Sequence, residues 1–277
     1  MRCVVLPAHN PGPYTGTGTN TYFLPGRVPT LVDAGTGDPR HIDNLARAVD
    51  EAGEGAVGLA QVLVTHAHVD HAAGAAALAS RWPRARFAKR PWPERDARHT
   101  VTWSPIADNE LVPAGDVSLW AIHTPGHSPD HLCFFEPHDG ILFAGDLVVN
   151  DGTVVIPASH GGSLADYLDS LRRILDLQPR VILPGHGRAV DQPAALLRGY
   201  IAHRMSRERQ VLDALAGGPL SVDGLADRIY RQLDPGLRPA ASESVLAHLI
   251  KLRNEGRAID EPAENGGTRW RLAGGRS

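Results

Sequence analysis

Four potential metal ligands lie within six consecutive positions of this sequence: His66, His68, Asp70 and His71. They follow an apolar run, residues 62–64, that reads as a short buried strand, and they precede an alanine-rich segment with high helix propensity. In an extended backbone, residues two apart point the same way, so His66 and His68 can share one target. The strand-to-helix turn then lets Asp70 and His71 face the same place. Imidazole nitrogens and carboxylates suit zinc, iron or manganese, and this spacing allows two ions to share the cluster.

Three later apolar segments repeat this arrangement, because each reads as a short strand that ends at a glycine-containing turn with a potential ligand. In chain order they are Val117–Ile122 with His127, Ile141–Phe143 with Asp146, and Val181–Leu183 with His186. Active sites are commonly assembled from loops at the ends of sheet strands. The four turns together therefore predict one metal centre, although any one of them would be weak support on its own.

Composition and charge narrow the classes of function. The chain has 277 residues, 42% hydrophobic and 21% charged, which is typical of a soluble globular protein. Its net charge of −3 provides no overall field that attracts nucleic acid or an anionic membrane. The N-terminus lacks the apolar core of a signal peptide, and no segment is long and apolar enough to span a bilayer. Cys3 and Cys133 are too few for a disulfide framework, so we expect a cytoplasmic protein without a membrane partner.

Turn signals and hydrophobic periodicity divide residues 1–200 into short strands and amphipathic helices. Besides the four strands above, strands are predicted at Cys3–Pro7, Thr21–Leu24, Thr30–Asp33, Arg84–Lys89, Leu111–Val112 and Leu132–Phe135. Helices are predicted at His41–Glu51, over the alanine-rich Ala72–Arg81 and at Leu164–Leu177. Pro91–Ala107 has no clear period and is predicted to be a loop.

Two further polar residues have alternative interpretations. Asp33, at the end of a predicted strand, either orients a metal ligand or holds the backbone of its turn. His160, in the loop before the helix at Leu164–Leu177, either reaches the substrate or is a solvated loop residue, and the second interpretation is favoured.

Residues 201–277 are predicted to form a second unit without further ligand motifs. The predicted helices are Ala194–Ala216, a helix from the N-cap Ser221 through Tyr230, and Ala241–Glu255, with a loop at Asp234–Pro239. Ala258-Ile259 and Arg269–Leu272 flank Glu264–Gly267, a strong signal for a hairpin turn. Three helices followed by a β-hairpin are the pattern of a winged-helix domain.

Winged helices often read duplex DNA through their third helix, so a gene regulator is a rival interpretation. Residues 218–277 contain nine basic and eight acidic residues, whereas DNA-binding domains are usually decidedly basic. We therefore do not expect duplex DNA as a partner. Packing over the catalytic cleft, or against another subunit in a homo-oligomer, is the favoured role.

The motifs THAHVDH, TPGHSPDH, GD at 145–146 and PGHG at 184–187 resemble those of the metallo-β-lactamase superfamily. NPGPY at 10–14, GTNTY at 18–22 and the tail are similar to its lactamase-β-like protein 2 group. Over residues 1–200 the resemblance implies an α/β fold, the αββα sandwich of two mixed sheets with helices outside. It also implies a ligand set, in which one metal is held by His66, His68 and His127, a second by Asp70, His71 and His186, and Asp146 bridges the two. His131, four residues after His127, has no metal role in that family.

Hydrolysis by a hydroxide held between two divalent metal ions is the expected function. Zinc is the expected metal, with iron or manganese also chemically acceptable. Asp70 is the expected catalytic residue, since it could orient the hydroxide and carry a proton to the leaving group. The expected substrate is a small ester, thioester or related carbonyl compound. Two alternatives stay open: a metal-dependent endoribonuclease that cuts single-stranded RNA, implied by resemblance to the animal member of the group, and a metal-binding regulator that uses the winged helix.

Overall fold

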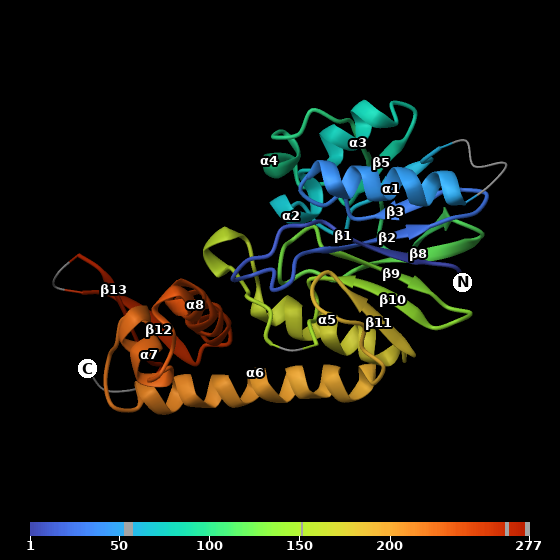
Figure 1. Cartoon of the computed structure of the whole chain (residues 1–277). Coiled ribbons are helices and arrows are strands. Elements are labelled where there is room, and N and C mark those ends of the chain that lie inside the picture. Colours follow the sequence, from blue (N-terminus) through green and yellow to red (C-terminus); the bar gives the residue numbers. More distant parts are fainter. Residues whose placement is uncertain (53–57, 151, 264–265, 275–277) are drawn as a thin grey trace.

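Two mixed β-sheets lie face to face in the computed structural model, which describes residues 1–52, 58–150, 152–263 and 266–274 (Figure 1). The first sheet has the spatial order β1 (Val4–Pro7), β2 (Asn20–Leu24), β3 (Thr30–Val32), β4 (Gln61–Leu63), β5 (Arg86–Lys89) and β6 (Trp103–Pro105). The second has the order β11 (Val181–Pro184), β10 (Ile141–Gly145), β9 (Leu132–Glu136), β8 (Val117–His123) and β7 (Glu110–Ala114). Strands β3 to β6 run parallel, as do β10 and β11, whereas the other neighbours in these sheets are antiparallel.

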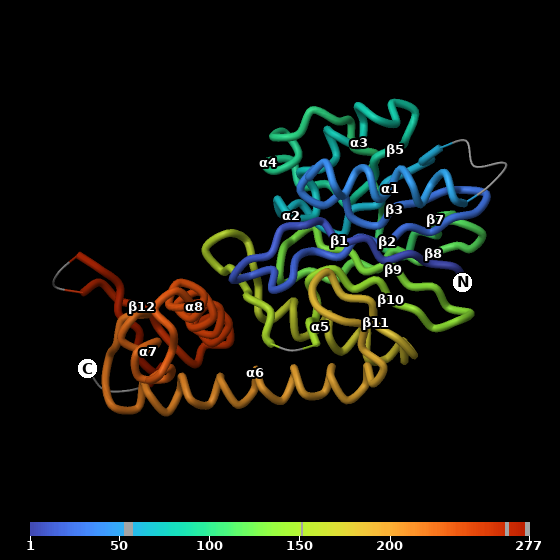
Figure 2. Tube along the Cα trace, viewed as in Figure 1, coloured from blue at the N-terminus to red at the C-terminus, as the bar shows by residue number. Residues whose placement is uncertain are grey.

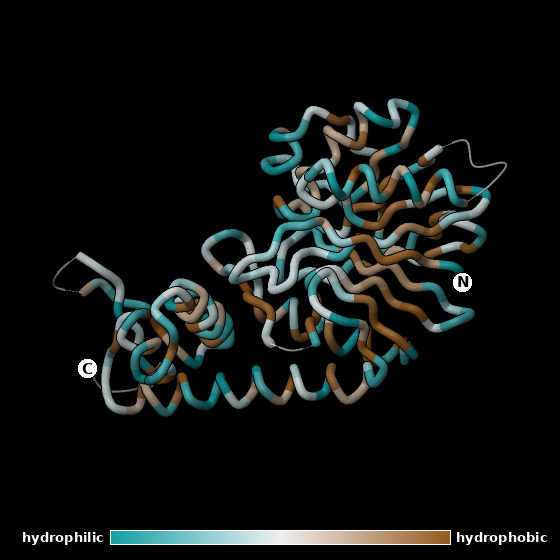
Figure 3. The backbone as a smooth tube through the Cα atoms, viewed as in Figure 1, coloured by the Kyte–Doolittle hydropathy of each residue, from teal (hydrophilic) through white to brown (hydrophobic). Residues whose placement is uncertain are grey.

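Apolar side chains fill the space between the two sheets. Leu24 and Leu63 of the first sheet belong to one buried cluster with Leu119, Phe134 and Phe143 of the second. Burial of each such side chain contributes roughly 1.5–3 kcal/mol. Strands that are covered on both faces read as nearly continuous apolar runs, and in Figure 3 the hydrophobic stretches accordingly gather on the inner strands of the two packed sheets.

Helices cover the outer face of each sheet (Figure 1). α1 (Pro39–Glu51) and α3 (Ala75–Arg81) pack on the first sheet, and α5 (Leu164–Asp176) and the first half of α6 (Pro193–Leu215) pack on the second. The expected αββα sandwich is therefore confirmed. Apart from the two segments described next, the predicted strands and helices before residue 193 are present, with ends shifted by one or two residues.

The single helix predicted over Ala72–Arg81 is wrong, because the chain forms α2 (Val69–Ala72) and α3 with a break at Gly74. The Gly74 N–H donates to the Gly35 carbonyl at 2.9 Å. A Cβ on Gly74 would lie 2.0 Å from the Ala34 carbonyl oxygen, so only glycine lets the two backbones approach this closely.

The segment Pro91–Ala107, predicted to be a loop, contains a short helix and an edge strand. α4 (Pro93–Asp96) starts with a proline at its first position, and Asp96 Oδ2 accepts the Trp92 N–H at 2.7 Å. β6 pairs in parallel with β5 at the edge of the first sheet. Both elements are too short to show a hydrophobic period, which is why the sequence did not reveal them.

The C-terminal unit has the winged-helix arrangement that the sequence predicts. After α6 it contains α7 (Val222–Ile229), the 3₁₀ turn η2 (Pro235–Leu237), α8 (Arg238–Asn254), and a hairpin of β12 (Ala258–Pro262) and β13 (Thr268–Leu272). Its separate core is built from residues such as Val211, Leu225, Val245, Leu249 and Trp270.

Two details of this unit differ from or complete the prediction. Ser221 is the N-cap of α7, as predicted, because its Oγ accepts the Gly224 N–H at 3.1 Å. The third helix begins at Arg238 and not at Ala241, so much of the predicted loop at Asp234–Pro239 is helical. Glu264 and Asn265 of the predicted hairpin turn lie outside the described residues.

Helix α6 is shared by the two units. In Figure 2 it runs from beneath the second sheet to the C-terminal helices. Leu197 and Tyr200 of α6 are part of the core beside the second sheet, whereas Val211 and Leu215 are part of the C-terminal core. A boundary between residues 200 and 201 would fall inside this helix, and the division of the chain there stays a prediction. Across the part of the chain that the structure describes, none of the helices could cross a membrane.

We expect Gly74→Ala to destabilise the protein by about 2 kcal/mol, because the new Cβ overlaps the Ala34 carbonyl and the backbone must shift. Gly199→Ala is the matched control, since Gly199 lies within α6 and has no atom within 4 Å of an added Cβ. It should be neutral or stabilising by up to about 1 kcal/mol. Urea unfolding of the three proteins measures the difference, and equal midpoints for both variants would contradict the close approach.

Candidate metal centre

The seven predicted metal ligands come together at one edge of the paired sheets, on turns that follow strands. The positions are His66 and His68 after β4, Asp70 and His71 on α2, His127 between β8 and β9, Asp146 after β10, and His186 after β11. Residues from four separate turns thus meet because their strands end side by side. Which ion each residue holds stays a prediction.

A first group is formed by His66, His68 and His127. His66 Nε2 lies 3.0 Å from His68 Nδ1, and His127 Nε2 lies 2.8 Å from the same atom. A tetrahedral zinc ion with Zn–N bonds of 2.0–2.1 Å separates its ligand nitrogens by about 3.3 Å. The three ring nitrogens therefore converge at nearly the spacing that one ion requires.

A second group is formed by Asp70, His71 and His186. Asp70 Oδ2 lies 3.3 Å from His71 Nε2 and 3.2 Å from His186 Nε2. These three side chains converge on one point as the first group does, with one carboxylate in place of an imidazole.

Asp146 faces both groups with different oxygens. Its Oδ1 lies 3.3 Å from both His71 Nε2 and His186 Nε2, whereas its Oδ2 lies 3.5 Å from His127 Nε2 and 4.0 Å from His66 Nε2. A carboxylate placed in this way can contribute one oxygen to each of two neighbouring ions.

The charges of these side chains suit a cation. Burial holds the pKa of His66 well below its ordinary value and lowers the pKa of His68 to about 3, so both imidazoles are neutral, as metal ligands must be. Burial opposes ionisation of Asp146, yet His71 and His186 hold its pKa well below the ordinary value. Burial by itself would lower the pKa of His186, but Asp146 and Asp70 raise it to about 10. The partly buried carboxylates thus draw positive charge into the cluster.

Two buried atoms at its centre, His71 Nε2 and Asp146 Oδ1, have no hydrogen-bond partner among the described residues. Such atoms are costly to bury unless something completes their coordination. The mixed set of nitrogen and oxygen donors is the one that zinc, iron and manganese accept. The residues present therefore fit divalent metal ions.

Asp33 makes the contacts of both roles considered for it. Its Oδ2 accepts from His71 Nδ1 at 2.8 Å, and its Oδ1 accepts the Thr65 N–H at 2.7 Å. The first contact leaves His71 Nε2 facing the cluster, and the second holds the turn after β4. Asp33 itself has a φ of 64°, a left-handed conformation that ends β3 at Val32.

Sequence reasoning did not find two other polar supports. His131 Nε2 accepts the Asp146 N–H at 3.1 Å and its Nδ1 lies 2.8 Å from Thr124 Oγ1, so it supports the backbone of a predicted ligand. Thr19 Oγ1 donates to Asp70 Oδ2 at 2.9 Å. Both contacts join segments far apart in the sequence, so spacing within a motif gives no sign of them.

An exposed apolar side chain lies between two of the predicted ligands. It is Val69, which has 71% of its surface exposed. His160 is exposed on the turn η1 (Ala158–His160), where its Nδ1 lies 2.8 Å from Ser159 Oγ. That His160 is a solvated loop residue stays a prediction.

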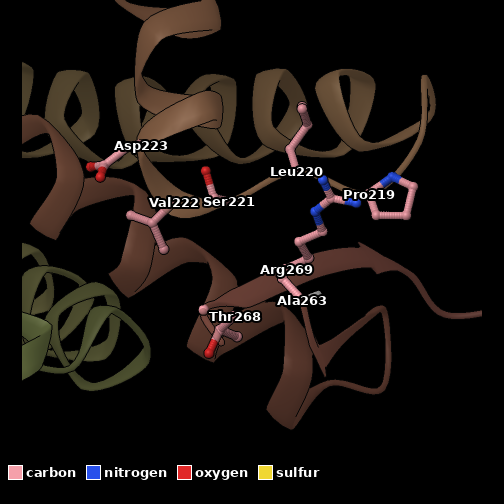
Figure 4. A pocket seen from close by; sticks show the side chains of 9 residues that line it. Pro219, Leu220, Ser221, Val222, Asp223, Ala263, Thr268 and Arg269 are labelled. Atoms are coloured by element: carbon pink, nitrogen blue, oxygen red, sulfur yellow. The ribbon is translucent and has the colours of Figure 1, made fainter. Parts of the chain in front are cut away.

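A hollow of about 470 Å³ lies on the C-terminal unit and contains none of the predicted ligands. It is bordered by the start of α7 and by β13, with Ser221, Thr268 and Arg269 among its side chains (Figure 4). The hollow is open to solvent, and its lining offers no cluster of metal-binding or nucleophilic groups, so we assign the chemistry to the sheet edge.

Comparison with known proteins agrees with this geometry. Residues 14–186 match the model of the metallo-beta-lactamase superfamily, and residues 221–270 match that of the beta-lactamase associated winged helix domain. The chain is 32% identical over 261 residues to the beta-lactamase-like protein 2 homolog of Drosophila melanogaster, which covers 90% of this chain and 86% of that protein. It is 30% identical over 286 aligned positions to an atrochrysone carboxyl ACP thioesterase of Aspergillus chevalieri, with 99% and 88% coverage.

A crystal structure of a beta-lactamase domain protein from Burkholderia ambifaria has the same fold, with a TM-score of 0.84 at 24% identity over 98% of this chain and 91% of that one. Fold, motifs and relatives agree over nearly the whole length of the chain. The protein is a hydrolase of the metallo-β-lactamase superfamily with a C-terminal β-lactamase-associated winged-helix domain.

Proposed function

We propose that this protein hydrolyses thioesters with two divalent metal ions, the first held by His66, His68 and His127 and the second by Asp70, His71 and His186. Asp146 would bridge them. The observation that carries the proposal is the placement of Asp146, whose Oδ2 faces the first group and whose Oδ1 faces the second. Two bound ions would lower the pKa of a water molecule and polarise the substrate carbonyl.

Asp70 has the position of a proton carrier in this proposal. Its Oδ2 is fixed by the Thr19 hydroxyl and lies beside His71 and His186, whereas no contact of Oδ1 is seen among the described residues. Oδ1 can therefore orient the attacking water and accept its proton. Fixing one carboxylate oxygen lets the other keep a constant direction.

A thioester is favoured because of its leaving group. A thiol has a pKa of about 8.5, so a thiolate can depart without the proton that an amine or an alkoxide requires. The Asp70 carboxylate accepts from the Thr19 hydroxyl, and ring nitrogens of His71 and His186 face the Asp146 carboxylate at 3.3 Å. Both carboxylates are thus set up as acceptors, which suits a leaving group that needs little acid assistance. Similarity to the Aspergillus protein, which is named as a thioesterase, supports the same substrate class.

We expect metal-loaded protein to hydrolyse an acyl thioester with a kcat/KM at least about tenfold above that of the matching oxygen ester, because only the leaving group differs. The assay compares this pair with a lactone, a chromogenic cephalosporin and single-stranded RNA. Cleavage of RNA without thioester hydrolysis would instead support the endoribonuclease interpretation.

Asp146→Ala should reduce bound metal from two ions per chain to one or none and lower thioester turnover about 10³-fold or more, because both ions lose a shared ligand. Asp166→Ala is the control, since Asp166 is an exposed carboxylate on α5 outside the cluster. Elemental analysis and initial rates provide the measurements. Two ions per chain in Asp146→Ala would show that Asp146 is not the bridge.

We also propose that the winged helix packs on the catalytic unit and does not read DNA. Its third helix, α8, contacts α5 and η1. Glu243 on α8 accepts the Ser159 N–H at 3.0 Å and also accepts from Ser159 Oγ. Ala247 and His248 of the same helix are buried, and Ala247 joins the core beside the second sheet. A helix held in this way is not free to enter the major groove.

Full-length protein should bind duplex DNA only weakly, with a Kd no tighter than about 10⁻⁶ M at physiological salt and no sequence preference. The reasons are the covered face of α8 and the near-neutral charge of residues 218–277. Fluorescence anisotropy across a salt series and several duplex sequences measures this. Sequence-selective binding near 10⁻⁸ M would favour the regulator.

A further inference from the structure

The segment of residues 152–156, which follows the Asp146 turn, lies directly behind one predicted metal ligand. It has no regular secondary structure, and its Val155 carbonyl lies 2.7 Å from His127 Nδ1. A carbonyl can only accept a hydrogen bond, so His127 must carry its proton on Nδ1. Its Nε2 is then left with a lone pair, and this atom faces His68 Nδ1 at 2.8 Å. The Val155 carbonyl thus selects the tautomer that can bind metal.

Side chains from α6 hold this segment and the residues before it. Arg204 Nη2 donates to the Val154 carbonyl, the peptide oxygen immediately before that of Val155. One helical turn earlier, the Tyr200 hydroxyl donates to the Val149 carbonyl at 3.0 Å and accepts the Val149 N–H at 3.1 Å. Residues four apart lie on the same face of a helix, so Tyr200 and Arg204 of α6 together hold the chain at Val149 and Val154.

Burial of Arg204 at this position lowers the stability of the fold. Its side chain is only 2% exposed, and within the described chain no carboxylate forms an ion pair with it. The nearest acid along the same face of α6, Glu208, pairs instead with Lys251 and Arg257. The guanidinium lies over the Tyr167 ring, 5.3 Å from its centroid. A charge that is buried without an acidic partner carries a desolvation penalty. An apolar side chain would fill the same space without that penalty.

We infer that Arg204 is a positioning residue for the first metal group. By fixing the Val154 peptide it sets the direction of the Val155 carbonyl, and that carbonyl sets the tautomer and orientation of His127. A residue beyond position 200 thereby acts on a ligand in the first unit. The inference rests on the proposed metal centre but not on the thioester substrate.

The test compares Arg204→Met and Arg204→Lys with Arg209→Met. Arg209 is the matched control, because it is an exposed arginine on the same helix. In metal-free protein, ¹⁵N NMR of the imidazoles reports the tautomer of His127. Wild type and Arg209→Met should show the single Nδ1–H form, Arg204→Met should show both tautomers, and Arg204→Lys should lie between them.

The second readout is the affinity for Zn²⁺ in competition with a chromophoric chelator. In Arg204→Met one of the two ions should bind about 10–100-fold more weakly, as expected when a support behind a ligand is lost. The affinity for the other ion should change by less than about threefold. If Arg204→Met lowers Tm but keeps the wild-type His127 signal and both zinc affinities, Arg204 is merely structural and the inference is wrong.

Tyr200→Phe keeps the test decisive if Arg204→Met fails to fold, because it removes only the hydroxyl that contacts Val149 and the Gly152 carbonyl, the latter at 3.3 Å. It should produce the same change in the tautomer of His127 and in zinc affinity, but a smaller one. Wild-type behaviour of this variant and of Arg204→Lys would overturn the inference. Neither readout needs a substrate, so failure of thioester hydrolysis leaves the result interpretable.

Discussion

The structure depends above all on the attraction between carboxylates buried at the sheet edge and positive charge placed among them. His71 is at the centre of this balance, with Asp33 at its Nδ1 and both Asp70 and Asp146 near its Nε2. Taking such charges out of water costs several kcal/mol for each ion unless they are paired. In the metal-free chain His71 and His186, whose pKa values the neighbouring carboxylates raise, supply that charge, and a bound cation would take over the role by displacing their protons.

The fold meets this requirement by supporting the ligands from behind. Asp33 contacts His71, Thr19 contacts Asp70, His131 contacts the backbone of Asp146, and the Val155 carbonyl contacts His127. Each support comes from a segment other than that of its ligand. The segments around the strand ends therefore do more than connect the sheets, because they also carry the polar groups that fix the direction of each donor atom.

The sequence was sufficient for the features that are local. Ligand motifs at strand ends, apolar strands and the order of helices and hairpin in the tail all appear within short windows, and the motifs led to the right fold class. Contacts between segments that are far apart in the chain could not be predicted from the sequence. At the break between α2 and α3, the Gly74 N–H donates to the carbonyl of the distant Gly35, and the role of His131 requires the backbone N–H of Asp146. Helical periodicity marks one face of α6 as buried, but it cannot tell that the guanidinium of Arg204 meets a peptide oxygen there.

The shared helix α6 has a consequence for how the chain is made. Its 23 residues extend for about 35 Å, and they supply core side chains to both units. During synthesis the outer layer of the second sheet stays incomplete until this helix has left the ribosome. A catalytic unit ending before Pro193 would emerge with that face covered only by α5, so apolar surface would stay exposed on nascent chains until the first turns of α6 dock. Recombination that exchanged only the C-terminal unit would have to join two genes within the codons of one continuous helix. The two units are therefore expected to be inherited together.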